Sequence, residues 1–211
     1  MVDLGISITH KELFIITEDS YARYNCRVGE VECLLVETED YQVVAPRGTE
    51  AGTLLSGLGF FDVIRDLRFF PWYDKRVGWS HAGFLKGAQG LVDKGLFGML
   101  DRDKPIVLTG HSLGGAISIN AAAILKSLDF NVVAVCTFGA PRTLMKSAAK
   151  RFNTVGIAIA EFSNAGDPIP DLPNSMWGYT HINEVHTPRE AKGYSIFRNH
   201  RLEHYGESFD V

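Results

Sequence analysis

The chain lacks the features that mark several large classes of protein. Its charges are scattered and nearly balanced, with 21 basic against 25 acidic side chains and a net charge of -4, so no basic stripe is available to nucleic acid. Its three cysteines (Cys26, Cys33 and Cys136) form no C-x-x-C pair, and we expect three reduced thiols. No uncharged apolar stretch approaches the length of a membrane span. We therefore expect no nucleic acid partner and no transmembrane segment.

Targeting and cofactor signals are also missing. Met1 to His10 has neither the basic head nor the apolar run of a signal peptide, so we expect a cytoplasmic protein that lysis could release. The sequence contains no H-E-x-x-H, Walker A or Rossmann pattern, so we expect no metal and no cofactor. No internal repeat, low-complexity tract or linker interrupts the 211 residues. We therefore expect a single domain over residues 1–211.

Apolar segments of strand character alternate with helical ones in the second half of the chain. Pro105–Thr109, Val132–Phe138 and Val155–Phe162 have the β-branched, apolar composition of strands that are buried on both faces. Between them lie an apolar helical run, Leu113–Leu128, and a helix near Thr143–Arg151. Strands that alternate with helices in this way form a parallel sheet connected by right-handed crossovers.

The first half of the chain adds to this sheet. Val31–Val36 and Tyr41–Val44 read as two strands joined by a turn, and we expect them at an antiparallel edge. The other elements that we expect are helices over Lys11–Tyr24, Asp62–Leu67 and Phe84–Leu100, weak strands near Trp177–Val185, and a last helix from about His200.

The segment Gly-His-Ser-Leu-Gly-Gly, which contains Ser112, follows one predicted strand directly and begins the long apolar helix. This context is typical of a nucleophile elbow, a tight turn that exposes a reactive serine. Gly110 and Gly114 fit such a turn, because a Cβ there would clash with neighbouring elements. The backbone N–H of Leu113, at the start of the helix, is a candidate donor to a developing oxyanion. The alternative is a serine that merely caps the helix.

A serine hydroxyl becomes a good nucleophile when an imidazole takes its proton and a carboxylate holds that imidazole. In folds of this kind the acid and then the histidine follow the serine along the chain. Asp167 is the favoured acid, because it lies on a loop directly after a predicted buried strand, although an Asp before proline also forms turns. Less well placed acids are Asp171, Glu161, Glu184 and Glu190, and the downstream histidines are His181, His186, His200 and His204.

Several segments in order along the chain resemble the class 3 lipases, the family that includes the fungal triacylglycerol lipases and feruloyl esterases. The similar segments are Arg47-Gly48-Thr49, the helix Asp62–Leu67, His81-Ala82-Gly83-Phe84, Thr109–Ala116, Thr137–Arg142 and Asn164–Pro173. The resemblance implies an α/β-hydrolase fold, with a mostly parallel central sheet, helices on both faces and an antiparallel N-terminal edge. The compact length looks more like bacterial or phage members than secreted fungal ones.

The resemblance also implies roles for single residues. It places the triad aspartate at Asp167 and the histidine near the C-terminus, shortly ahead of a tyrosine, with a spacing that favours His200 over His204. It points to Thr49 as the second oxyanion donor, through its backbone N–H and its hydroxyl. Pro46 departs from the family pattern, which usually has an aromatic or aliphatic residue before the arginine.

One further segment, Glu50–Phe61, stands where lipases carry a lid. Its five large apolar side chains and three glycines suit a hinged cover over an acyl chain or a lipid interface. A helix packed on the sheet is the alternative.

Together these patterns predict a serine carboxylester hydrolase that acts through an acyl-enzyme on acylglycerols or other carboxylic esters, with a small-molecule ester or lipid substrate and transient contact with a lipid interface. Phospholipase, feruloyl esterase, thioesterase and amidase activities stay open, because sequence does not identify the residues that line the pocket. A non-catalytic interaction module with the same fold is the alternative from another class. The intact set of Ser112, Asp167 and His200 argues against it.

Overall fold

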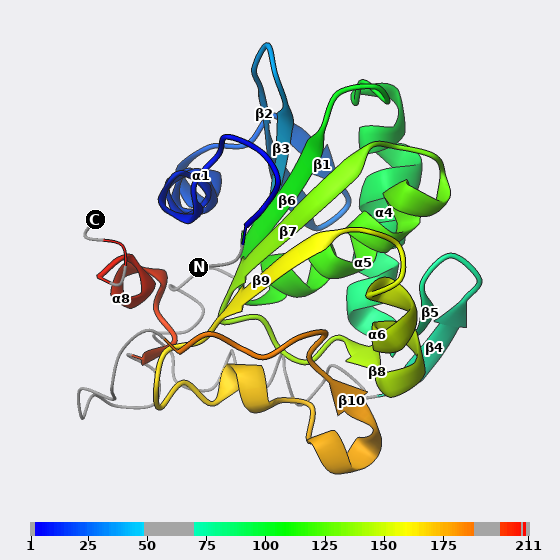
Figure 1. Ribbon diagram of the computed structural model, residues 1–211, viewed down its shortest axis with the longest axis vertical. Coiled ribbons are helices and arrows are strands. Elements are labelled where there is room, and N and C mark those ends of the chain that lie inside the picture. The colour runs from blue at the N-terminus through cyan, green and yellow to red at the C-terminus, as the bar shows by residue number, and fades with distance from the viewer. Residues whose placement is uncertain (1–2, 49–69, 188–198, 208, 210–211) are drawn as a thin grey trace.

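The computed structural model describes residues 3–48, 70–187, 199–207 and 209. Its central sheet has six strands in the order β1-β2-β3-β6-β7-β9 (Figure 1). β3, β6, β7 and β9 are parallel, whereas β1 and β2 pair antiparallel with their neighbours. The strands are β1 (Cys26–Val28), β2 (Val31–Glu37), β3 (Gln42–Pro46), β6 (Ile106–His111), β7 (Val132–Phe138) and β9 (Ala158–Phe162). The predicted parallel sheet with an antiparallel N-terminal edge is confirmed.

Helices cover both faces of this sheet (Figure 1). Successive strand residues point to opposite faces, so they divide between two apolar clusters. Val43 and Val107 pack in the cluster that includes α1 and α8, and Val44 and Leu108 in the cluster that includes α4 and α5. The helices are α1 (His10–Ala22), α4 (Ala82–Lys94), α5 (Leu113–Ser127), α6 (Lys146–Phe152) and α8 (Leu202–Gly206), and the 3-10 turns are η1 (Leu96–Gly98), η2 (Ile169–Asp171) and η3 (Ser175–Trp177).

Helix α1 begins where the sequence supplies a capping box. The Thr9 side chain accepts a hydrogen bond from the N–H of Glu12, and the Glu12 carboxylate accepts one from the N–H of Thr9. Leu13 and Phe14 then pack the helix against the sheet. Its position matters for the site, because α1 lies beside β6, the strand that leads to Ser112.

A second, antiparallel sheet in the order β10-β8-β5-β4 packs beside α6 (Figure 1). Its strands are β4 (Pro71–Asp74), β5 (Gly78–His81), β8 (Leu144–Met145) and β10 (Tyr179–Thr180). The prediction of a helix from Thr143 is wrong at its start, because Leu144 pairs with Ser80 and Thr180 and the helix begins at Lys146.

Three sequence-based expectations fall on residues outside the described ranges: the helix Asp62–Leu67, the lid over Glu50–Phe61, and the oxyanion donor Thr49. Within the described ranges, no helix has both the length and the apolar character needed to cross a bilayer.

Candidate active site

Ser112 occupies a strained turn between β6 and α5. Its φ of 56° and ψ of -126° lie in a region that L-residues rarely adopt, at a cost of about 1–3 kcal/mol. The hydrogen bond from Ser112 N to the Phe138 carbonyl, 2.9 Å long, helps to hold the turn. A Cβ on Gly110 would lie 2.5 Å from the carbonyl carbon of Gly114, and a Cβ on Gly114 would overlap the carbonyl oxygen of Pro46. The two glycines therefore let three backbone segments meet around the serine.

The structure brings Ser112, His200 and Asp167 together from positions far apart in the chain. His200 Nε2 lies 2.8 Å from Ser112 Oγ, and His200 Nδ1 lies 2.7 Å from Asp167 Oδ2. All three residues are buried. A carboxylate only accepts hydrogen bonds, so Nδ1 carries the hydrogen and Nε2 of a neutral ring is left to accept the serine O–H. The Ser112 side chain makes no hydrogen bond to the start of α5, unlike a capping serine.

The Asp167 carboxylate is held on both oxygens. Oδ1 accepts a 2.9 Å hydrogen bond from the N–H of Ile169, and Oδ2 accepts a 2.5 Å bond from the Tyr205 hydroxyl as well as the one from His200. Burial, together with the adjacent carboxylate, raises the pKa of Tyr205 well above its ordinary value, so the phenol keeps its proton and donates. In the sequence this tyrosine stands out only as a marker for the histidine, and nothing there indicates its contact with the acid.

Some of the alternative candidates lie away from the serine. His204 is engaged on α8 itself, where its Nδ1 lies 2.9 Å from Glu207 Oε1. His186 pairs with β9 through its backbone. Glu184 is exposed, and Glu190 lies outside the described residues.

Glu161, His181 and Asp171 take part in structural contacts near the acid loop. His181 Nδ1 lies 2.8 Å from Glu161 Oε1, and its Nε2 donates to the Pro170 carbonyl over 2.8 Å. Asp171 forms an ion pair with Arg142. These contacts connect β9 and β10 with the loop that follows Asp167, so the residues support the site without touching the serine.

Of the two expected oxyanion donors, the structure describes Leu113. Leu113 is the first residue of α5, where backbone N–H groups have no acceptor within the helix. Gly48 lies against this end of the helix, since a Cβ on Gly114 would stand 3.0 Å from Gly48 N. The chain therefore reaches the serine turn immediately before Thr49, which itself lies outside the described residues.

This site stands in a chain whose residues 43–177 match the family model for lipase (class 3), well over half of its length. The chain belongs to the class 3 lipase family. The α/β-hydrolase fold that the motifs implied is thereby confirmed, since the solved structures similar to this chain are lipases of that fold.

Named relatives match only part of the chain. A secreted mono- and diacylglycerol lipase 2 of Gibberella zeae is 38% identical over 98 residues, which cover 41% of this chain and 24% of the relative. The solved triacylglyceride lipase of Rhizomucor miehei has a TM-score of 0.67 at 20% identity, over 80% of this chain and 75% of that one. Another similar structure, with a TM-score of 0.67 at 21% identity, covers 80% of this chain and 75% of its own, and is a triacylglycerol lipase whose catalytic centre is described as a serine protease triad. The chain spans about a quarter of the length of the first curated relatives it matches.

The comparison corrects the expectation of a cytoplasmic protein. The Gibberella zeae relative is named as secreted, and so are relatives from Penicillium and Fusarium species. The expectation was wrong because it rested only on the first residues of the given sequence. A leader is removed from the mature protein and takes no part in the fold, so the first residues of a sequence do not identify a compartment.

Proposed function

We propose that this chain is a carboxylic ester hydrolase that acts on acylglycerols or other carboxylic esters. The observation that carries the proposal is the pair of hydrogen bonds that connects Ser112 through His200 to Asp167. Membership of the class 3 lipases and the acylglycerol lipases among its relatives support the same reaction. We also propose that residues 1–211 form a single domain, so that one cooperative unfolding transition is expected.

In the proposed mechanism, Ser112 Oγ attacks the ester carbonyl carbon while His200 Nε2 takes the hydroxyl proton. Asp167 holds the ring in the tautomer that can accept this proton and stabilises the imidazolium that forms. The carbonyl oxygen becomes an oxyanion, for which the N–H groups of Leu113 and Thr49 are the proposed donors. His200 then gives the proton to the leaving alkoxide as the C–O bond breaks, which leaves an acyl-enzyme. Water, activated by the same imidazole, releases the carboxylic acid and restores the serine.

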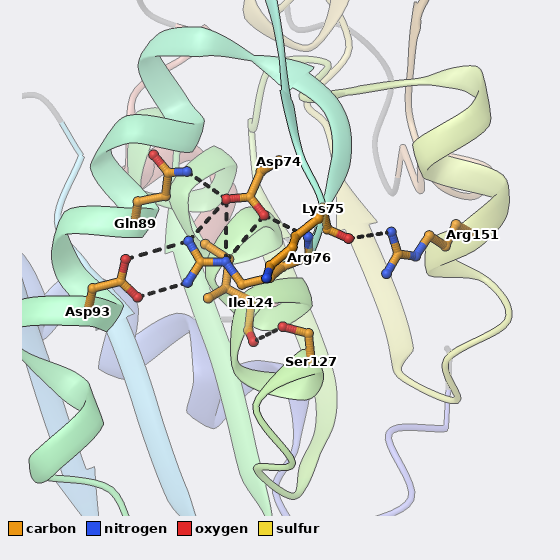
Figure 2. Close-up of polar contacts among 8 residues, drawn as sticks. All are labelled: Asp74, Lys75, Arg76, Gln89, Asp93, Ile124, Ser127 and Arg151. Atoms are coloured by element: carbon orange, nitrogen blue, oxygen red, sulfur yellow. Dashed lines mark hydrogen bonds and ion pairs between the residues drawn. The ribbon is translucent and has the colours of Figure 1, made fainter.

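Turnover of p-nitrophenyl butyrate by the wild type, Ser112→Ala and Ser127→Ala tests this proposal. Ser127 is a matched control, because it lies at the other end of α5 and its hydroxyl donates only to the Ile124 carbonyl (Figure 2). We expect Ser112→Ala to abolish turnover and Ser127→Ala to retain it. Equal rates for Ser112→Ala and the wild type would remove the proposal. A series of acyl chain lengths, with a phospholipid and a feruloyl ester, would then define the substrate.

We further propose that the second sheet contacts a lipid interface during catalysis. The hairpin β4–β5 exposes Trp72, Tyr73 and Trp79, at 63%, 54% and 45% of their surface. The nearby turn η3 exposes Met176 and Trp177. A groove of about 470 Å³ lies between these elements, and its lining residues are Pro71, Trp79, Met145, Lys146, Ser147 and Gly178. Aromatic side chains beside lysine are typical of surfaces that lie at the boundary between water and lipid.

The hairpin is held in place on its polar side, so its aromatic residues are exposed on a fixed element. Arg76 binds both Asp74 and Asp93, and Gln89 donates to Asp74 over 2.7 Å, which connects the hairpin turn to α4 (Figure 2). Burial opposes ionisation of Asp74, but the hydrogen bonds from Arg76 and Gln89 outweigh it and lower the pKa to about 2. This ion pair therefore stays charged at any ordinary pH.

Co-sedimentation with phosphatidylcholine vesicles that contain phosphatidylglycerol tests the lipid contact. We expect the double variant Trp72→Ala, Tyr73→Ala to bind the vesicles several-fold more weakly than the wild type, because less apolar surface enters the interface. Tyr24→Ala is the control, since Tyr24 is similarly exposed but lies just after α1, outside this surface. The same loss in both variants, or in neither, would contradict the assignment of this surface.

A further inference from the structure

The histidine of the serine motif, His111, has contacts that the reaction scheme does not use. Its ring is buried and lies 4.7 Å from the His200 ring, centroid to centroid. Its Nε2 lies 2.8 Å from the carbonyl oxygen of His200, and its Nδ1 lies 2.9 Å from the hydroxyl of Tyr21 in α1. The Tyr21 hydroxyl also packs directly against the backbone of Gly48, since a Cβ on Gly48 would overlap its oxygen. His111 therefore contacts the residue that supplies the base, and Tyr21 contacts the segment that leads to Thr49.

The direction of these hydrogen bonds follows from the chemistry of the groups. A carbonyl oxygen only accepts, so His111 Nε2 carries a hydrogen and donates to His200. Burial, with His200 as a further cause, lowers the pKa of His111 well below its ordinary value, so the ring is neutral and Nδ1 has no hydrogen. Tyr21 then donates its O–H to Nδ1. The donors run in one direction, from Tyr21 to His111 to the His200 carbonyl, and such chains strengthen each bond in them.

The spacing of the two elements explains why Tyr21 meets His111. Two residues along a strand advance about 6.6 Å, and four residues along a helix advance about 6 Å. Thr17 and Tyr21 of α1 therefore come into register with Thr109 and His111 of β6. Thr17 Oγ1 lies 2.7 Å from Thr109 Oγ1, one step before the Tyr21–His111 contact. Each contact crosses the same interface, but only the second reaches the site.

We propose that Tyr21 and His111 are positioning residues: their hydrogen bonds fix the backbone and ring of His200, and the Tyr21 hydroxyl packs against the backbone of Gly48. This inference rests on the proposed ester hydrolase activity and deepens it. Tyr21 and His111 therefore connect His200, which supplies the base, with Gly48, which leads to Thr49. His200 therefore keeps its distance to Ser112 while Gly48 keeps its position beside the serine turn. A small displacement of either part lowers the rate of attack, because proton transfer and oxyanion binding need aligned groups.

The test compares Tyr21→Phe with Thr17→Val. Each substitution removes one buried side-chain hydrogen bond between α1 and β6, so both variants are expected to lose similar stability. In the proposal only Tyr21→Phe affects catalysis. We expect it to lower kcat for p-nitrophenyl butyrate about ten-fold, with KM within about two-fold of the wild type, because neither Tyr21 nor His111 binds the substrate. Thr17→Val is expected to keep the wild-type kcat. Equal kcat losses in the two variants, or none in Tyr21→Phe, overturn the proposal.

A phosphorylation assay separates this inference from the proposed function. Diethyl p-nitrophenyl phosphate reacts with an activated serine: Ser112 Oγ bonds to phosphorus, p-nitrophenolate leaves, and His200 takes the hydroxyl proton. A wild type that releases no p-nitrophenolate refutes the ester hydrolase and the inference with it. A wild type and a Tyr21→Phe variant that react equally fast refute the inference alone. We expect both proteins to release p-nitrophenolate, and Tyr21→Phe to do so about ten-fold more slowly than the wild type.

A double-mutant cycle then shows whether Tyr21 acts through His111. His111→Leu removes both ring hydrogen bonds, and Tyr21→Phe made in that background is expected to have less than half of its original effect on kcat. His111→Gln is expected to retain more activity than His111→Leu, because its amide N–H groups can still donate to the His200 carbonyl. If Tyr21→Phe has the same effect in both backgrounds, the connection through His111 is refuted.

Discussion

Gly114→Ala is a direct test of how closely the backbone is packed around the serine. In an ordinary helix the change would stabilise the protein by about 1 kcal/mol, because alanine has the higher helix propensity. At position 114 the new Cβ would overlap the Pro46 carbonyl oxygen and lie 3.0 Å from Gly48 N and 3.1 Å from the Arg47 carbonyl carbon. All three are backbone atoms, so no flexible side chain can move away. The site must shift instead.

The size of the effect follows from these contacts. Forcing an extra carbon into a packed site costs typically about 1–3 kcal/mol, and rigid backbone neighbours favour the upper end of that range. After the gain in propensity, we expect a net loss of about 2 kcal/mol, which lowers Tm by about 4–8 °C for a chain of this size. The shift moves Arg47 and Gly48 away from the serine turn, so we also expect kcat to fall by about a hundred-fold.

Gly90→Ala is the matched control, because Gly90 is also a helical glycine, and nothing lies within 4 Å of its ideal Cβ. We expect this variant to gain about 1 kcal/mol and to keep its activity. Thermal unfolding monitored by circular dichroism gives both Tm values, and p-nitrophenyl butyrate turnover gives kcat. The reasoning fails if Gly114→Ala gains stability as Gly90→Ala does and remains fully active.

Three further predictions concern single interactions of the site. Ser112→Gly should be more stable than Ser112→Ala by about 1–3 kcal/mol, because both lose the hydroxyl but only glycine tolerates a φ of 56°; equal Tm values would contradict the strain. Tyr205→Phe should lose about 1.5–3 kcal/mol in urea unfolding, and about ten-fold in kcat, because the Asp167 carboxylate loses its 2.5 Å donor; an unchanged kcat would show that this bond does not support the acid. Burial opposes protonation of His181, but the hydrogen bond and charge of Glu161 outweigh it and raise the pKa of His181. Its contribution to stability is therefore full below the unfolded value of about 6.5 and lost as pH rises through the raised folded value, so Tm of the wild type should fall relative to His181→Gln as pH rises above about 6.5.

The sequence predicted those parts of the fold whose signal is local. A strand buried on both faces is a short apolar run, so Val132–Phe138 was predicted with its observed ends. The serine turn was predicted from its glycines, because two of them stand where a Cβ would strike backbone. The strand predicted from Val155 begins only at Ala158, since Gly156 adopts a positive φ of 72° and makes a turn there.

The second sheet has a weaker local signal, although β10 falls within the weak strands predicted near Trp177–Val185. Its strands are two to four residues long, and β4 exposes Trp72 and Tyr73 in succession, so no alternation between buried and exposed positions marks it. Tyr21 and Tyr205 were missed as partners of the site for a related reason. Their sequence neighbours indicate helices, whereas their contacts with His111 and Asp167 span 90 and 38 residues and depend on the tertiary fold.

The position of His200 depends on aromatic packing, because α8, the helix that follows it, is only five residues long. Such a helix is not stable by itself. Tyr205 instead packs edge-on against Phe138, and Phe209 contacts Phe14, Phe138 and Phe162 at 5.3–5.8 Å between centroids. Phe138 is the last residue of β7, and its backbone carbonyl also accepts the hydrogen bond from the Ser112 N–H. The aromatic cluster that fixes the C-terminal segment therefore also borders the serine turn, and this shared position ties the distance between His200 and Ser112 to the packing of the hydrophobic core.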